Sequence, residues 1–139
     1  MYILSPEISL SVIPQSVFKD LDTDTYPDLI RLNDKHREEY WVHNQHARIG
    51  EMFPEQDNLF ARRTDLAAAE TFKAVDTLFL VYKIEKISDE LKAQAALGTD
   101  DHPLMKMIRM VLDISEYTGD ECSAEFISND LIAFRLWWD

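Results

Sequence analysis

The segment that decides the fold is residues 64–98, TDLAAAETFKAVDTLFLVYKIEKISDELKAQAALG. It has no glycine or proline before Gly98, and it is rich in alanine, leucine, glutamate and lysine, which favour helices. Its apolar positions recur at helical spacing, at Leu66, Phe72, Val75, Phe79 and Tyr82. The pattern predicts one long helix with a break near Ser88. The apolar run LFLVY, and with it LFLVYKI at 78–84, also fits a buried strand, which remains the alternative.

Two flanking segments also predict helices. Thr25 and Pro27 are typical of a helix start, and the segment from about Pro27 to Gly50 predicts the first long helix. Asp101 and Pro103 predict the start of another helix, which ends before Gly119. The inward face of this helix is predicted to carry Leu104, Ile108, Val111 and Ile114.

The two ends of the chain contain the clearest strand signals. ISLSVI, residues 8–13, alternates apolar residues with serine and predicts a short strand that Pro14 ends. SAEFISNDLIAFRLWWD, residues 123–139, fits either one helix or a hairpin that turns at SND and pairs with the N-terminal strand. We therefore predict a single, mainly α domain over residues 1–139, a compact bundle of about four helices. The α+β alternative adds a small β element formed by the two terminal segments.

The composition excludes several classes of protein. The chain is 46% hydrophobic and 29% charged, which is typical of a globular protein rather than a disordered acidic tail. Cys122 is the only cysteine, so no internal disulfide can form and a reducing cytoplasm is expected. The N-terminus does not resemble a signal peptide, and no apolar run approaches the ~18 residues of a membrane span. With three glycines, the sequence has no phosphate-binding loop, dinucleotide fingerprint or nucleophile elbow, and we expect no cofactor.

The net charge of -12 is concentrated at the two ends. Residues 1–28 have five acids and one base, residues 29–109 have fourteen and twelve, and residues 110–139 have seven and one. Contact with phosphate requires a basic surface, so direct binding to nucleic acid or to an anionic membrane is not expected.

Three of the four histidines lie in HREEYWVHNQH, residues 36–46. On a helix, His36, Tyr40 and His43 share the apolar stripe, and the two histidines are about 10.5 Å apart along the axis, too far to bind one ion. The set Glu39, His43 and His46 has a spacing that permits a metal site with two histidines and one carboxylate. The favoured interpretation is a polar-edged packing face, without a metal.

Two segments of this region, RLNDKH (Arg31 and His36) and REEYWVH (Arg37 and His43), resemble the Arg-x4-6-His motif of HEPN ribonucleases, which are small helical proteins. The resemblance implies a site in which arginine stabilises phosphate and histidine moves protons. The residue after the arginine is Leu32 or Glu38 here, rather than a small polar residue. A metal-dependent or HEPN-like hydrolase centred on Arg37, Glu39, His43 and His46 is therefore the second hypothesis.

The acidic residues and tryptophans are the candidate binding residues. Asp113, Glu116 and Asp120 would form a carboxylate ridge if the helix continued through them. Tryptophan is enriched at binding hot spots, and the chain ends in Trp137 and Trp138. The predicted partner-binding set is Asp20, Asp22, Asp24, Asp28, Asp113, Glu116, Asp120, Glu121, Glu125, Trp41, Trp137 and Trp138. Asp120 and Glu121 are also expected to raise the pKa of the Cys122 thiol, making it a poor nucleophile.

These features predict a small, acidic, non-enzymatic protein that binds the basic, nucleic-acid-binding surface of a partner protein. The class by analogy is the phage anti-CRISPR or anti-defence inhibitor, or an immunity protein, with a nuclease or CRISPR effector subunit as the partner. A third hypothesis is an assembly subunit whose LFLVY segment and tryptophans are buried in an oligomer.

Overall fold

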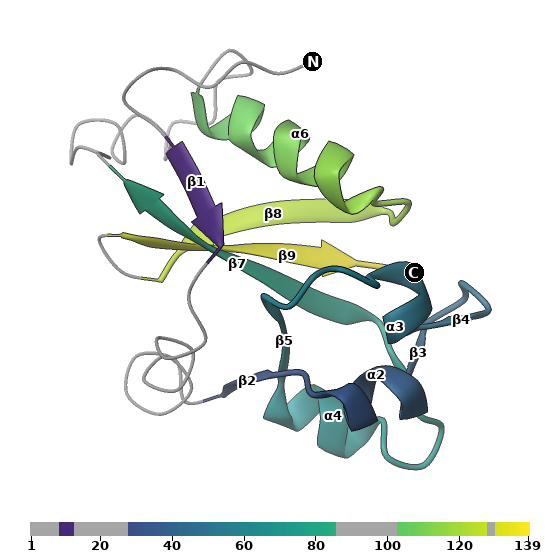
Figure 1. The fold of residues 1–139 in the computed structure, drawn as a ribbon. Coiled ribbons are helices and arrows are strands. Elements are labelled where there is room, and N and C mark those ends of the chain that lie inside the picture. Colours follow the sequence, from purple (N-terminus) through teal and green to yellow (C-terminus); the bar gives the residue numbers. More distant parts are fainter. Residues whose placement is uncertain (1–8, 13–27, 86–102, 128–129) are drawn as a thin grey trace.

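The computed structural model describes residues 9–12, 28–85, 103–127 and 130–139, and within these ranges the chain is mostly β (Figure 1). The elements in chain order are β1 (Ser9–Val12), β2 (Leu29–Arg31), α2 (Asp34–Glu39), β3 (Trp41–Val42), β4 (Ala47–Arg48), α3 (Ile49–Met52), β5 (Leu59–Arg62), α4 (Arg63–Ala68), β6 (Ala74–Val75), β7 (Thr77–Glu85), α6 (Pro103–Ser115), β8 (Glu121–Phe126) and β9 (Leu131–Trp137). The mainly α bundle predicted from the sequence is therefore wrong.

The larger sheet is built around β7, with the strand order β2-β5-β7-β9-β8. One edge of β7 pairs antiparallel with β9 from Thr77 to Lys83. Its other edge pairs with β5 at Phe79 and Leu80, and with β1 from Tyr82 to Glu85. Because both edges and both faces are occupied, the LFLVY segment at 78–82 is buried within this one chain.

The long helix predicted over residues 64–98 is wrong within its described part. The chain forms α4 only as far as Ala68, and β6 and β7 follow it. The strand alternative for LFLVYKI is confirmed, since residues 78–84 lie within β7. Alternate β7 side chains belong to two separate apolar clusters, one with Leu78 and Leu80, the other with Phe79 and Val81. This two-faced burial by strands distant in the sequence outweighs the local preference for helix. Residues 86–98 lie outside the described residues.

The longest described helix, α6, packs on one face of the larger sheet. Met107, Ile108 and Val111 are buried in the same apolar cluster as Leu136 of β9. The predicted helix from Pro103 is thus confirmed, and so are Ile108 and Val111 as inward residues. Ile114 is 53% exposed, which contradicts its predicted place, and the side chain of Leu104 lies outside the described residues. No helix in the described ranges has the length and apolar character needed to cross a membrane.

Both predicted terminal β segments are present. β1 lies within the predicted strand at residues 8–13, and the C-terminal segment is the β8–β9 hairpin rather than a helix. The partner of β1 was predicted wrongly, because β1 pairs with β7 and not with the hairpin. Beside β5, β1 fills the remaining length of the β7 edge, while β9 occupies the opposite edge.

The predicted helix from Pro27 to Gly50 is also wrong within its described part. Asn33 caps α2, which ends after six residues because Tyr40 adopts an extended conformation. β3 then pairs antiparallel with β4 and parallel with β6 to form a second, three-stranded sheet. The turn between β3 and β4 has positive φ angles at Asn44 and His46. The histidine-rich stretch is therefore divided among a short helix, a strand and a turn.

Candidate functional site

His36 and Asn33 form a reciprocal cap at the start of α2. The Asn33 Oδ1 accepts from the His36 backbone N–H at 2.9 Å, and the His36 Nδ1 accepts from the Asn33 N–H at 3.3 Å. Burial lowers the pKa of His36, with Glu39 opposing this shift and Lys35 adding to it. His36 Nδ1 can accept this hydrogen bond only when it is unprotonated. The neutral side chain of His36 is therefore part of the cap of α2.

Arg37 is engaged by backbone carbonyls. Its guanidinium donates to the carbonyl of Phe53 at 3.0 Å and to that of Gln56. Arg31 similarly donates from Nε to the carbonyl of Asp57 at 2.8 Å. Burial lowers the pKa of Arg37, with a further contribution from Arg31. The two arginines thus hold the loop that follows α3 in place. Neither arginine lies on one continuous helix with the histidine of its segment, as the resemblance to the HEPN motif had implied.

The predicted metal set is not brought together. Glu39 lies at the end of α2, where it faces Lys35 at 3.9 Å and Lys73 at 4.0 Å. His43 and His46 lie in the β3–β4 turn, outside the helix that the spacing assumed. Among the described residues, which include all three, no group of three histidine, cysteine, aspartate or glutamate side chains is arranged to hold a metal ion.

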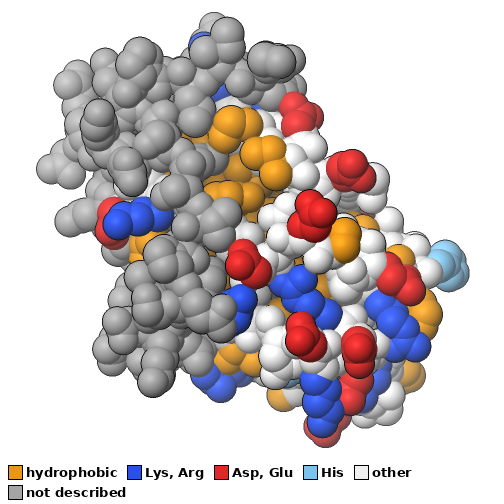
Figure 2. Space-filling model, in the orientation of Figure 1, with side chains coloured by type: hydrophobic (Ala, Val, Ile, Leu, Met, Phe, Trp, Pro, Cys, Tyr) orange, Lys and Arg blue, Asp and Glu red, His pale blue; other side chains and the backbone are white. Residues whose placement is uncertain are grey.

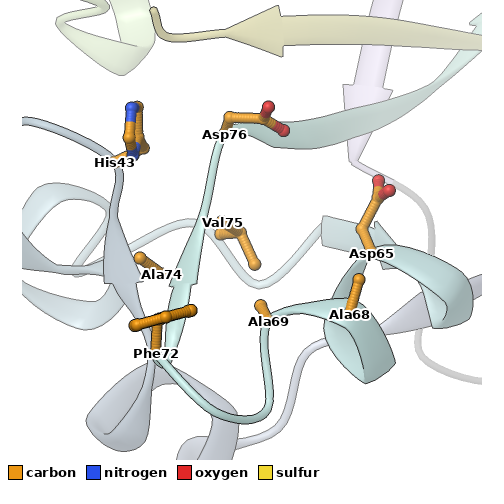
Figure 3. Close-up of a pocket in the computed structure, with 8 residues that line it drawn as sticks. All are labelled: His43, Asp65, Ala68, Ala69, Phe72, Ala74, Val75 and Asp76. Carbon is orange, nitrogen blue, oxygen red and sulfur yellow. The ribbon is translucent and has the colours of Figure 1, made fainter.

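A pocket of about 270 Å³ lies where β6, the start of β7, α4 and the β3–β4 turn meet (Figure 3). We call it the Asp65–Asp76 pocket, and its lining consists of His43, Asp65, Ala68, Ala69, Phe72, Ala74, Val75 and Asp76. Figure 3 shows Asp65 and Asp76 toward one side, and His43 and Phe72 toward the other. The pocket therefore combines an apolar floor with one acidic and one aromatic wall.

Strand register explains how these residues meet. β3 and β6 are parallel, with Val42 beside Val75, so His43 and Asp76 follow equivalent positions. The His43 N–H donates to the Val75 carbonyl at 2.8 Å. Before β6, Lys73 has a φ of 53°, a left-handed conformation that turns the chain. Phe72 lies at this turn and is 83% exposed.

The two carboxylates of the pocket differ in their surroundings. Asp65 Oδ2 lies 3.2 Å from Arg62 Nε, and both atoms are buried without a linear hydrogen bond. Burial raises the pKa of Asp65; Arg62 opposes the shift, while Asp76 and Asp28 add to it. Asp76 is exposed, and its Oδ1 accepts from the Thr77 hydroxyl at 2.9 Å. Asp76 therefore repels the Asp65 carboxylate, but more weakly than Arg62 attracts it.

A second acidic region spans the end of α6, the turn after it and β8. Asp113, Glu116, Asp120, Glu121 and Glu125 are all exposed. The continuous helical ridge predicted for the first three is wrong, because α6 ends at Ser115. We call these five residues the α6–β8 carboxylates. Figure 2 shows acidic side chains over one face of the molecule, mixed with lysine and arginine around α2 and α4.

The turn after α6 is fixed by its backbone. Glu116 has a φ of 51°, and the N–H groups of Glu116 and Tyr117 donate to the carbonyls of Asp113 and Leu112, at 3.4 and 3.1 Å. This is the Schellman arrangement that usually places glycine at the left-handed position. The Tyr117 hydroxyl accepts from the Trp137 N–H at 3.2 Å. The turn is therefore anchored to the end of β9.

The remaining predicted acids do not extend this surface. Asp28 is half-buried, and its Oδ2 accepts from the Thr64 hydroxyl at 3.3 Å. Asp20, Asp22 and Asp24 lie outside the described residues.

The three tryptophans have different roles in the fold. Trp138 is fully buried between Phe53 and Tyr117, with ring centroids 6.1 and 5.3 Å away, so it belongs to the core rather than to a binding surface. Trp137 is half-buried. Trp41 is 37% exposed and carries the Arg48 guanidinium 4.6 Å above its ring. Trp41 thus remains the accessible tryptophan.

Cys122 has a thiol whose pKa is raised to about 11. The predicted direction is confirmed, but the cause is burial rather than the neighbouring acids.

Sequence reasoning missed the Asp65–Asp76 pocket because it placed residues 65–76 on one helix. The sequence pattern that could have revealed the pocket is the change from the alanine-rich segment before Glu70 to the apolar run after Asp76, which marks the end of the helix and the start of the strand. Comparison of the chain with protein families, with curated proteins and with solved structures finds no match.

Proposed function

We propose that this protein is a non-enzymatic binding protein that docks on the basic, nucleic-acid-binding surface of a partner protein. The class is that of the anti-CRISPR, anti-defence and toxin-immunity inhibitors, and the partner is a nuclease or an effector subunit. The observation that carries the proposal is the exposure of all five α6–β8 carboxylates in a segment whose only bases are Lys106 and Arg109.

The backbone around these acids supports a preorganised surface. In β8, Glu121, Ser123 and Glu125 are exposed and alternate with half-buried residues. β8 is the last strand of the sheet order, and Tyr117 holds the preceding turn against β9. Glu121 is 3.9 Å from Arg135, with both side chains partly exposed, so solvent screens this pair. Carboxylates in fixed positions steer a basic partner and determine its orientation.

The proposal is tested by association kinetics. Affinity capture from a host lysate that contains defence complexes supplies the partner, and binding is then measured from about 0.01 to 1 M salt, over which the Debye length falls from roughly 30 to 3 Å. We expect the association rate to fall by about tenfold or more, because the encounter is electrostatic. Free nucleic acid is expected to compete with this protein for the partner.

A pair of charge-reversal variants locates the surface. The double variant Asp113→Lys/Glu116→Lys is expected to slow association more than Glu38→Lys/Glu70→Lys, which changes the net charge equally at exposed positions elsewhere. Equal effects of the two variants, association that is independent of salt, or capture of a partner without a nucleic-acid site would contradict the proposal.

A further inference from the structure

The Asp65–Asp76 pocket has the size and lining of a receptor for one side chain. Its volume of about 270 Å³ is smaller than the 300 Å³ or more typical of pockets for drug-sized ligands. Ala69 and Val75, which form part of its floor, are buried, whereas Phe72 at its rim is 83% exposed. A side chain with an apolar stem and a polar end would cover the floor and reach the acidic wall.

The charges of the pocket select a cation. Asp65 and Asp76 both line it, and Arg62 Nε lies 3.2 Å from Asp65 Oδ2. A positive group placed between the two carboxylates would offset the repulsion between them. The third ionisable group is His43 at the opposite wall. Because the described residues hold no arrangement of three metal-binding side chains, an organic cation is favoured over a metal ion.

We infer that the Asp65–Asp76 pocket binds an arginine side chain of the partner protein, with the guanidinium at the two carboxylates and the apolar stem over the floor of the pocket. A guanidinium is planar, pairs with carboxylates through several N–H groups and stacks on aromatic rings, whereas an ammonium is a compact and strongly hydrated charge. This inference rests on the proposed function, since it names one contact that the basic partner makes.

The test uses the full chain and a defined probe, the peptide acetyl-Gly-Arg-Gly-amide. Its matched control carries citrulline, which has the same shape as arginine but no charge. Backbone amide NMR shifts are followed during each titration. We expect saturable shifts at residues 43 and 65–76 with the arginine peptide, weaker shifts with a lysine peptide, and none with the citrulline peptide.

Variants inside and outside the pocket distinguish binding in the pocket from general attraction of the peptide to an acidic surface. Asp76→Asn keeps an oxygen that can accept from Thr77, and it is expected to weaken peptide binding by about tenfold, the loss of one charge-assisted hydrogen bond. Phe72→Ala removes an exposed ring, and a smaller loss is expected. Glu38→Gln, at an exposed position outside the pocket, is expected to leave binding unchanged. Thermal unfolding of each variant shows whether it is folded.

Several results would overturn the assignment: binding of the citrulline peptide with equal affinity, shifts centred on residues 113–125, equal weakening by Glu38→Gln and Asp76→Asn, or no saturable shift. The proposed function is judged separately. If the peptide does not bind while partner association still depends on salt, only the pocket assignment fails. If the peptide binds in the pocket but partner association is independent of salt, the pocket assignment stands and the proposed function fails.

Discussion

Glu116 is a charged residue at a position where helices prefer glycine. It holds the left-handed site of the Schellman turn after α6, with a φ of 51°. A side chain in this conformation costs roughly 1 kcal/mol relative to glycine. Since the same residue is exposed among the α6–β8 carboxylates, its stability cost is consistent with a role in binding.

Replacement of Glu116 tests this conflict directly. Glu116→Gly is expected to raise the free energy of unfolding by about 1 kcal/mol, because glycine adopts the left-handed conformation without strain. The measurement is urea unfolding followed by circular dichroism. Glu125→Gly is the control, since it removes the same charge from a strand, where glycine is expected to destabilise. A Glu116→Gly variant less stable than the wild type would refute the strain argument.

Asp65 presents a similar conflict within the pocket. Its pKa is raised mainly by burial, so the carboxylate is less favourable in the folded protein than in the unfolded chain. The carboxylate is therefore not kept for stability alone, although Arg62 compensates in part at 3.2 Å. Titratable groups with a shifted pKa that line a pocket are candidates for functional residues.

Among the elements, α2 depends on its cap because it has only six residues and buries none of them fully. The cap uses the neutral form of His36, whose pKa is lowered by burial. A folded-state pKa below the ordinary value means that the unfolded chain binds the proton more readily. The contribution of His36 to stability is thus complete above about pH 6.5 and declines as the pH falls below this value.

His36→Gln tests this pH dependence. Glutamine at the same position can still accept from the Asn33 N–H, but it carries no titrating group. We expect the stability of the wild type to fall more than that of His36→Gln between about pH 7 and pH 5. Unfolding midpoints across this range provide the measurement, with His46→Gln, an exposed residue outside the cap, as the control. If the stability of the wild type and that of His36→Gln fall equally with pH, protonation of the cap is not the cause of the loss.

Sequence patterns identified some elements and not others, for physical reasons. α6 was predictable because Pro103 and an amphipathic pattern lie within one short window. β1 was predictable because alternation identifies a strand without reference to its partner. The chain near Val75 was assigned to a helix because its pairing with Val42 joins segments 33 residues apart, which local preference does not reveal. The acidic residues after α6 were found as a group, but the turn at Glu116 changed their arrangement.

At the scale of the whole molecule, Trp138 joins parts of the chain that are distant in sequence. Its ring contacts Phe53 and Tyr117, and its backbone N–H donates to the Asp76 carbonyl at 2.9 Å. The tryptophan therefore connects the loop after α3, the turn after α6 and the rear of the Asp65–Asp76 pocket. Trp138 is thus a core residue that also contacts one residue beside each proposed binding surface, Tyr117 and Asp76.

Truncation of Trp138 measures this contribution. Trp138→Ala is expected to lower the free energy of unfolding by about 3–5 kcal/mol, because it leaves a large cavity in the core. Trp137→Ala, at the half-buried last residue of β9, is expected to cost less. Chemical unfolding of both variants provides the comparison. Equal losses would mean that the buried position of Trp138 does not determine its contribution.

The position of β7 has a consequence for biosynthesis. β9 pairs with seven residues of β7, yet it is completed only at Trp137, 52 residues after Glu85. At about 5–20 residues per second, the ribosome needs roughly 3–10 seconds to make this interval. For that time one edge of β7 is without its longest partner, and such an edge can pair with other chains. Until the final strand emerges, nascent chains are therefore exposed to pairing between copies along this edge.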